Sequence, residues 1–266
     1  MQPVALTIAG SDPSGGAGIQ ADLKTFHQFG VYGEAVITLL TVQNTMRVSR
    51  VVTMDAELVI DQLRAVLEDI PPAAAKTGAL GNAAIVEAVA EAAVDFSFPL
   101  VVDPVLISKH GALLIDNGAR ESLIKRLIPR ASLVTPNIQE AEALTKKTIR
   151  NLAGMRDAAR RIADLGAAAV LVKGGHLEGI ATDVLYAAGE WYEFPAPRID
   201  TTNTHGTGCT CSAAVTAELA RGTTLPSAVA RAKTFTWEAI RSSPGLGRGA
   251  GPVNHHAATE HVFAAH

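Results

Sequence analysis

The chain alternates short runs of β-branched and aliphatic residues with longer segments in which apolar residues recur at helical spacing. The short runs cover residues 4–9, 34–41, 73–77, 100–103, 133–135 and 169–172. The segment 55–69 is typical of the helical ones, with Asp55 placed to cap its N-terminus. Strands that alternate with helices form a parallel sheet covered on both faces. The sequence therefore predicts an α/β protein with three layers, α/β/α, and a largely parallel central sheet.

The same alternation continues to the end of the chain. Further helices are expected at 17–29, 82–93, 119–127, 139–144, 210–220 and 226–241, and another is expected between Asn151 and Gly166. Residues 182–186 and 191–194 flank Gly189 and predict a hairpin. Residues 245–251 are a glycine-rich loop, and no repeat or linker divides the sequence. We therefore expect one domain spanning residues 1–266.

Charge and cysteine content exclude several classes of protein. The formal net charge is −3 with no basic block, which argues against nucleic acid as a partner. The first ten residues carry no basic side chain, and their apolar run ends in Ser-Asp-Pro, so neither a signal peptide nor a membrane span is expected. Cys209 and Cys211 are too close in sequence for an ordinary structural disulfide. A reducing, cytoplasmic setting fits these features.

Residues 200–212 join a strand-like run to an alanine-rich helical run, with His205-Gly206-Thr207-Gly208-Cys209 at the junction. Glycines let the backbone approach a ligand, and a helix that begins there would direct its free N–H groups and positive dipole end at an anion. A thiol on the first turn would have a lowered pKa, so Cys209 is a candidate base or nucleophile. The alternative is a tight turn whose cysteine is merely buried.

Polar residues follow most of the predicted strands. They are Asp12, Gln43 with Asn44, Lys76, Asp103 with Lys109, Asn137 and Lys173. In an open parallel sheet, ligands bind beyond the carboxyl ends of the strands, so these residues should meet at one edge. Any one of them alone could be a solvated side chain or a helix cap. The set as a whole predicts a ligand site.

The sequence departs from two common nucleotide-binding patterns. No Gly-x-x-x-x-Gly-Lys-Ser/Thr occurs, which disfavours a P-loop kinase. Gly16, Gly18 and Ala21 match the dinucleotide pattern Gly-x-Gly-x-x-Gly/Ala, but Gln43 and Asn44 stand where a ribose-binding acid is expected. The loop between the first strand and helix is also long for that motif. An NAD-binding Rossmann protein therefore remains only the weaker alternative.

Six ordered blocks resemble the hydroxymethylpyrimidine and phosphomethylpyrimidine kinases of thiamine biosynthesis, in the ribokinase-like group. The blocks are residues 9–25, 42–45, 102–105, 135–141, 173–176 and 203–210, and they extend over nearly the whole chain. The resemblance implies a ribokinase-like fold and a homodimer. It also implies two successive ATP-dependent phosphorylations of 4-amino-5-hydroxymethyl-2-methylpyrimidine, to the monophosphate and then the diphosphate.

The resemblance also implies roles for individual residues. The residues that would bind the pyrimidine are Asp22, Gln43, Gly10, Ala79 and Val105, and those that would bind ATP are Asn137, Lys173, Asp103, Lys109 and His176. Glu140, helped by Asp103, would bind Mg²⁺. The transferring phosphoryl group would be bound by Gly206, Thr207, Gly208 and Cys209. A carboxylate and an amide can pair with the donor and acceptor edge of an aminopyrimidine, and Mg²⁺ commonly takes one or two carboxylates. Lys109 and His176 carry the weakest local signal, because a surface lysine or a loop histidine would look the same.

Two departures from related kinases bear on the chemistry. Sugar kinases of the wider group have an aspartate base where this chain has Cys209, so the resemblance implies a thiolate base that takes the hydroxymethyl proton. Ala79 stands where many family members have methionine, which implies a wider pocket and keeps a pyridoxine or pyridoxal kinase as an alternative. A small-molecule binding protein without catalysis is a further alternative. Cys211 is expected to fill the core, since Cys-x-Cys alone makes no metal site.

Overall fold

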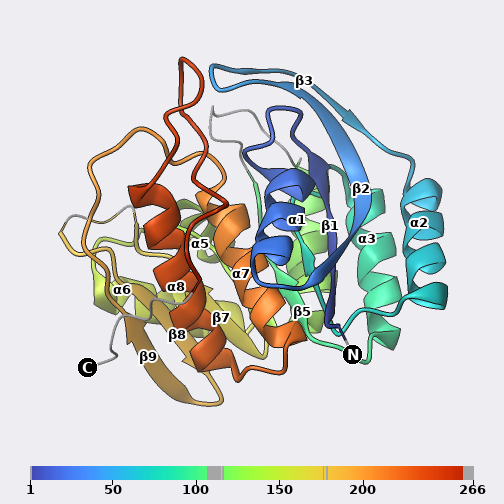
Figure 1. Cartoon of the computed structure of the whole chain (residues 1–266). Coiled ribbons are helices and arrows are strands. Elements are labelled where there is room, and N and C mark those ends of the chain that lie inside the picture. Colours follow the sequence, from blue (N-terminus) through green and yellow to red (C-terminus); the bar gives the residue numbers. More distant parts are fainter. Residues whose placement is uncertain (1, 107–114, 116, 176, 178, 260–266) are drawn as a thin grey trace.

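The computed structural model describes residues 2–106, 115, 117–175, 177 and 179–259, and the strands of these residues form a nine-stranded sheet in the order β3-β2-β1-β4-β5-β6-β7-β8-β9 (Figure 1). Six strands pair in parallel: β1 (Val4–Ser11), β2 (Tyr32–Gln43), β4 (Ala74–Thr77), β5 (Leu100–Val102), β6 (Leu133–Val134) and β7 (Ala169–Val172). The predicted α/β class with a largely parallel central sheet is confirmed.

Both edges of the sheet are antiparallel. β8 (Asp183–Ala187) and β9 (Glu190–Phe194) form the predicted hairpin beside β7. At the other edge, β3 (Val48–Thr53) runs antiparallel to β2. The sequence analysis missed β3, because its side chains are exposed or only half-buried and give no alternation of buried and polar residues.

Helices cover both faces of the sheet (Figure 1). One face carries α1 (Gly18–Gln28), α7 (Thr207–Ala220) and α8 (Leu225–Arg241), which share a buried apolar cluster. The other face carries α2 (Ala56–Asp69), α3 (Ala83–Ala92), α4 (Asn117–Ser122), α5 (Ile138–Thr145) and α6 (Leu152–Ala163). Short 3₁₀ and π turns cover Ala93–Asp95, Leu123–Leu127 and Ile128–Arg130. Neighbouring strand residues contribute to opposite clusters, as Val101 and Val102 do, which gives the three layers.

Side-chain caps begin several helices where the sequence predicted them. Asp55, Asn82 and Asn151 each accept a hydrogen bond from a backbone N–H in the first turn of α2, α3 and α6. The helix expected from Thr210 begins earlier, at Thr207, and Gly206 is its N-cap. Cys209 therefore lies on the first turn of α7 and not in a loop before it.

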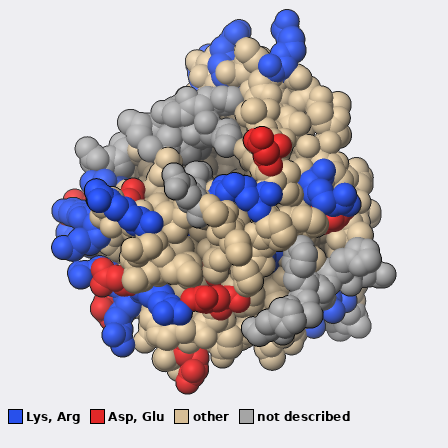
Figure 2. All heavy atoms as spheres, turned by 90° about the vertical axis from the view of Figure 1, so that its left-hand side faces the viewer, with Lys and Arg blue, Asp and Glu red and all other residues tan. Residues whose placement is uncertain are grey.

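The topology brings the polar strand ends together. β1 lies between β2 and β4, so the chain winds outward from it in both directions. At such a reversal, the connections leave the sheet on opposite faces and open a crevice beyond the carboxyl ends of the strands. No helix among the described residues is long and apolar enough to cross a membrane. Basic and acidic side chains intermingle on the face that Figure 2 shows.

Candidate active site

A cavity of about 670 Å³ lies beyond the carboxyl ends of the parallel strands. Residues at or just after the carboxyl ends of β1, β2, β4, β5 and β7 line it, among them Asp12, Gln43, Lys76, Asp103 and Lys173. The first turn of α7 and part of α8 complete the wall. A cavity of this size accommodates a nucleotide and a small acceptor side by side.

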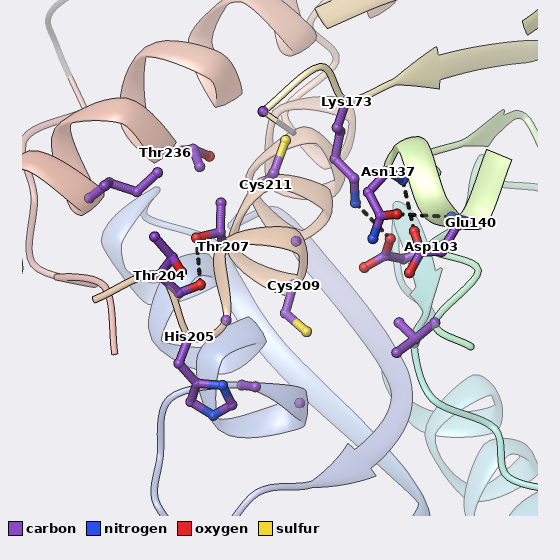
Figure 3. Close-up of a pocket in the computed structure, with 18 of the residues that line it drawn as sticks. Asp103, Asn137, Glu140, Lys173, Thr204, His205, Thr207, Cys209, Cys211 and Thr236 are labelled. Carbon is purple, nitrogen blue, oxygen red and sulfur yellow. Dashed lines mark hydrogen bonds and ion pairs between the residues drawn. The ribbon is translucent and has the colours of Figure 1, made fainter. Parts of the chain in front are cut away.

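Residues 205–209, called the anion loop below, comprise the turn that enters α7 and the first residues of this helix (Figure 3). Gly206 has φ +81°, and a Cβ there would lie 1.7 Å from the carbonyl oxygen of Gly16, so only glycine fits. No side chain caps this end of α7, and Thr207, Gly208 and Cys209 all line the cavity. The free N–H groups of a first helical turn bind phosphate well.

Cys209 corrects one expectation from the sequence. Burial raises the pKa of its thiol to about 12, although Lys76 and the backbone N–H of Gly18 favour the thiolate. The predicted lowering of the pKa is therefore wrong. The helix N-terminus does not decide the sign here, because desolvation of the half-buried thiol and the carboxylates of Asp22 and Asp103 oppose its ionisation.

Lys173 and Asp103 form an ion pair beside the anion loop (Figure 3). Lys173 Nζ lies 3.0 Å from Asp103 Oδ1, and Asp103 also accepts hydrogen bonds from Thr135 and Ser212. Burial opposes the charge on Lys173, but Asp103 and Glu140 outweigh it and raise its pKa. A Cβ on Gly208 would lie 3.3 Å from Lys173 Nζ, so this cation is next to the first turn of α7.

Asn137 and Glu140 form a capping box at the start of α5. Asn137 Oδ1 accepts from the N–H of Glu140 at 2.9 Å, and Glu140 Oε2 accepts from the N–H of Asn137 at 2.8 Å. Burial raises the pKa of Glu140 to about 7. A desolvated carboxylate of this kind gains from a cation placed beside it.

Lys76 and Asp22 form a second, fully buried ion pair, and both charges act on the thiol of Cys209. Lys76 Nζ lies 2.9 Å from Asp22 Oδ2, which also accepts from Thr7 Oγ1 at 2.6 Å. Lys76 lines the cavity, whereas Asp22 lies behind it and is completely covered. Asp22 therefore contacts Lys76 and does not line the cavity. A direct contact between Asp22 and a pyrimidine stays a prediction.

The remaining wall joins the loop after β1 to the anion loop. Asp12 Oδ2 lies 2.8 Å from Nε2 of His205, and the Gln43 carboxamide lies 3.2 Å from the same Nε2 atom. Asp12 and His205 are both buried. Gly10, Ala79 and Val105 also line the cavity, and their role in binding an acceptor stays a prediction.

The chain matches a known protein family along most of its length. The family model for phosphomethylpyrimidine kinase matches residues 12–254. The chain is 46% identical to the hydroxymethylpyrimidine/phosphomethylpyrimidine kinase of Haemophilus influenzae over 95% of this chain and 96% of that protein. The chain belongs to the phosphomethylpyrimidine kinase family.

Other relatives and solved structures agree with this assignment. The chain is 51% identical to the thiamine biosynthesis bifunctional protein ThiED of Geobacter sulfurreducens, over 97% of the chain and only 53% of that protein, so it spans about half the relative's length. A phosphomethylpyrimidine kinase structure from Clostridium difficile superimposes with a TM-score of 0.80 at 44% identity, covering 90% of this chain and all of that one. Pyridoxal kinase of Bacillus subtilis, in an ADP complex, gives a TM-score of 0.89 at 38% identity over 97% and 98% of the two chains.

Most residues that the family resemblance singled out lie around this cavity. Those that line it are Gly10, Gln43, Ala79, Asp103, Val105, Asn137, Glu140, Lys173, Gly206, Thr207, Gly208 and Cys209. Lys109 and His176 lie outside the described residues. Asn44 turns away and accepts hydrogen bonds from the N–H groups of Met46 and Arg47. Cys211, on α7, is buried in the apolar cluster, as predicted for a core residue, and it also lines part of the cavity (Figure 3).

The sequence analysis missed the wall formed by α8 and the segment before the anion loop. Pro197, Ile199, Thr236, Trp237 and Ile240 line this part of the cavity. Its apolar and aromatic character suits the flat base of a nucleotide. Lys233 on α8 pairs with Asp183, which accepts the N–H of Gly174 at 2.8 Å and so anchors the loop after β7. The residues of this wall belong to no sequence motif. The half-apolar face of the helix predicted at 226–241 was the one feature of the sequence that could have indicated them.

Proposed function

We propose that the chain transfers the γ-phosphoryl group of ATP to 4-amino-5-hydroxymethyl-2-methylpyrimidine and then to its monophosphate, giving the diphosphate used in thiamine biosynthesis. The observation that carries the proposal is the anion loop at the N-terminus of α7, which lies between the Lys173–Asp103 pair and the pocket beside Gln43. Family membership supplies the substrate class.

Phosphoryl transfer depends mainly on positioning and on stabilising charge. In the proposed arrangement, the acceptor lies beside Gln43, Ala79 and Val105, and the triphosphate extends from the wall of α8 past Lys173. The N–H groups of Gly208 and Cys209 then bind the transferring group, and the ammonium of Lys173 offsets its negative charge. The apolar wall around Trp237 excludes water from the nucleotide base.

Glu140 and Asp103 are the carboxylates that we propose to hold Mg²⁺. The raised pKa of Glu140 fits a cation, since binding would stabilise the carboxylate that burial disfavours. Bound there, Mg²⁺ would neutralise charge on the phosphates of ATP. Asp103 already accepts from Lys173, Thr135 and Ser212, so Glu140 is the carboxylate with more capacity for the metal or for its waters.

Cys209 is proposed as the group that takes the hydroxymethyl proton in the first phosphorylation. Its thiol lines the cavity, and Lys76 opposes part of the cost of forming the thiolate. The pKa of about 12 makes the thiolate scarce but strongly basic once formed. The second phosphorylation has a phosphate as acceptor and needs no such base.

Pyridoxal kinase activity is the second candidate. The superposition with the pyridoxal kinase of Bacillus subtilis favours it, and so does Ala79, whose small side chain leaves room in the acceptor pocket. The test is to incubate the protein with MgATP and, separately, hydroxymethylpyrimidine, its monophosphate and pyridoxal, and to identify products by mass spectrometry. We expect the diphosphate from the first two. No diphosphate from either would refute the proposal, and pyridoxal phosphate alone would establish the second candidate.

We further propose that the protein is a cytoplasmic homodimer. Both cysteines are free thiols, which suits a reducing compartment. Exposed apolar side chains gather on β2 and β3, namely Leu40, Val42 and Val52, together with Met46 in the turn between these strands. Light scattering coupled to gel filtration would give the mass, and a monomer at micromolar concentration would refute the dimer.

A further inference from the structure

Asp12, His205 and Gln43 form a chain of polar side chains whose hydrogen bonds can be oriented from chemistry alone. Asp12 and His205 are each 3% exposed. Gln43 ends β2 and lines the acceptor side of the cavity, as do the other two residues. Nε2 of His205 is the shared atom, at 2.8 Å from Asp12 Oδ2 and 3.2 Å from the amide nitrogen of Gln43.

The carboxylate of Asp12 is an acceptor in all of its described contacts. The N–H and O–H groups of Ser14 and the N–H of Ala17 donate to its carboxylate. Burial opposes its ionisation, but hydrogen bonds from His205 and Ser14 outweigh burial and lower the pKa of Asp12. A carboxylate has no proton to give, so the contact at 2.8 Å is the Nε2–H of His205 donating to Asp12. Nε2 therefore carries a hydrogen and cannot accept one.

This assignment determines which end of the Gln43 carboxamide faces His205. An amide N–H₂ group cannot donate to an Nε2 that already carries a hydrogen, so two donors meet at 3.2 Å. Rotating the carboxamide by 180° removes the conflict, because Oε1 of Gln43 then accepts a hydrogen bond from the Nε2–H of His205. The same Nε2–H also donates to Asp12. The amide N–H₂ group is left on the cavity side.

The imidazole ring is held firmly enough to impose this choice. A Cβ on Gly16 would lie 2.5 Å from Cδ2 of His205, so the ring packs directly against the loop after β1. The backbone of His205 is also tied down, since its N–H donates to Gly251 and its carbonyl accepts from Val253. Turning the ring would break the contact between Nε2 and Asp12 Oδ2 at 2.8 Å.

We propose that Asp12 and His205 are a positioning pair that holds Gln43 as a hydrogen-bond donor toward the acceptor pocket, so that Gln43 binds a ring nitrogen of a heteroaromatic acceptor. The inference rests on the proposed function and sharpens it. An aminopyrimidine offers ring nitrogens that accept and an exocyclic amine that donates, and only a ring nitrogen pairs with Gln43 held in this way. Because His205 directly precedes Gly206, the same pair connects the ring-binding side to the anion loop.

The first test compares Gln43→Glu with Gln43→Ala. Glutamate keeps the size of the side chain and accepts from His205, but offers the cavity no donor at neutral pH. We expect Gln43→Glu to raise KM for hydroxymethylpyrimidine about tenfold to a hundredfold, at least as much as Gln43→Ala, with KM for ATP nearly unchanged. If the carboxamide oxygen faced the ring amine instead, Gln43→Glu would retain or improve binding, and that result would overturn the inference. Gln2→Glu, the same change on an exposed residue, is the matched control.

The second test separates positioning from packing. It uses two acceptor analogues in which the ring nitrogens are replaced one at a time by C–H. Wild type should discriminate against one analogue about tenfold to a hundredfold in kcat/KM. His205→Leu frees the carboxamide to turn, so this ratio should fall to within about threefold of unity. A loss of packing alone would lower kcat/KM for all acceptors together and keep the ratio, which would overturn the positioning role.

Calorimetric binding of the pyrimidine and both analogues without ATP distinguishes failure of the inference from failure of the proposed function. A wild type that phosphorylates the pyrimidine but binds it and both analogues equally would overturn only the inference about Gln43. A wild type that neither binds nor phosphorylates it would overturn the proposed function as well.

Discussion

The buried Lys76–Asp22 pair gives the sharpest prediction for stability. Both side chains are fully covered, and Nζ lies 2.9 Å from Oδ2. At that separation, and at the effective dielectric constant of about 20 that suits protein sites, the attraction is about 6 kcal/mol. The free-energy cost of removing the ammonium of Lys76 from water offsets part of this attraction. Removing one member and leaving the other charge buried costs about 3–5 kcal/mol in known cases.

We therefore expect Lys76→Met to lower the free energy of unfolding by about 3–5 kcal/mol, because Asp22 keeps only the hydroxyl of Thr7 as a donor among its described hydrogen bonds. Asp22→Asn should also destabilise, since it leaves Lys76 without its partner. The double variant should lose at least about 2 kcal/mol less than the sum of the single losses.

Urea unfolding followed by circular dichroism measures all four proteins of this cycle. Lys125→Met, which breaks an exposed pair with Glu121, is the matched control and should change stability by less than about 1 kcal/mol. Additive single losses, or a Lys76→Met loss no larger than that of the control, would refute the reasoning.

Three further predictions concern the reaction and its setting. Cys209→Ala should slow the first phosphorylation about a hundredfold or more and the second much less, measured by product formation from each acceptor; equal losses would contradict a base role. Glu140→Gln should raise the Mg²⁺ concentration needed for half-maximal rate with little change in KM for the pyrimidine, and an unchanged Mg²⁺ requirement would remove Glu140 from the metal site. Burial lowers the pKa of His255 to about 4, so the neutral ring favours folding above the unfolded-state pKa of 6.5, and this stability is lost as the pH falls from 6.5 toward 4. Between pH 6.5 and pH 4, the free energy of unfolding of His255→Gln should therefore fall by about 2 kcal/mol less than that of the wild type. Denaturant titrations of both proteins at each pH would test this.

The fold and much of the site follow from the sequence because their signals are local. Buried strands, capping residues such as Asp55 and Asn82, and the glycines around Thr207 each determine structure within a few positions. The rule that ligands bind at the carboxyl ends of parallel strands then brings Asp103 and Lys173 together. The ion pair between them confirms that step.

What the sequence did not predict depends on distant contacts. Asp12 and His205 are 193 positions apart, and nothing near either residue indicates the other. The thiol of Cys209 was expected to be acidic from its place on a helix, but desolvation and the distant carboxylates of Asp22 and Asp103 raise its pKa instead. The wall of α8 has no motif, because apolar contacts with a nucleotide base look like ordinary core residues.

The packing of α1 has a consequence for the order in which the molecule forms during synthesis. Phe26 and Phe29, from α1 and its C-terminal end, belong to the apolar cluster that also contains residues of α7 and α8 and Val253, which the ribosome makes last. Phe29 and Phe235 meet edge to face at 5.0 Å between ring centres. Until α7 and α8 emerge, α1 lacks these partners, so the nascent chain exposes aromatic surface for most of its translation. Chaperone dependence should therefore fall sharply only when the last helix has left the ribosomal tunnel.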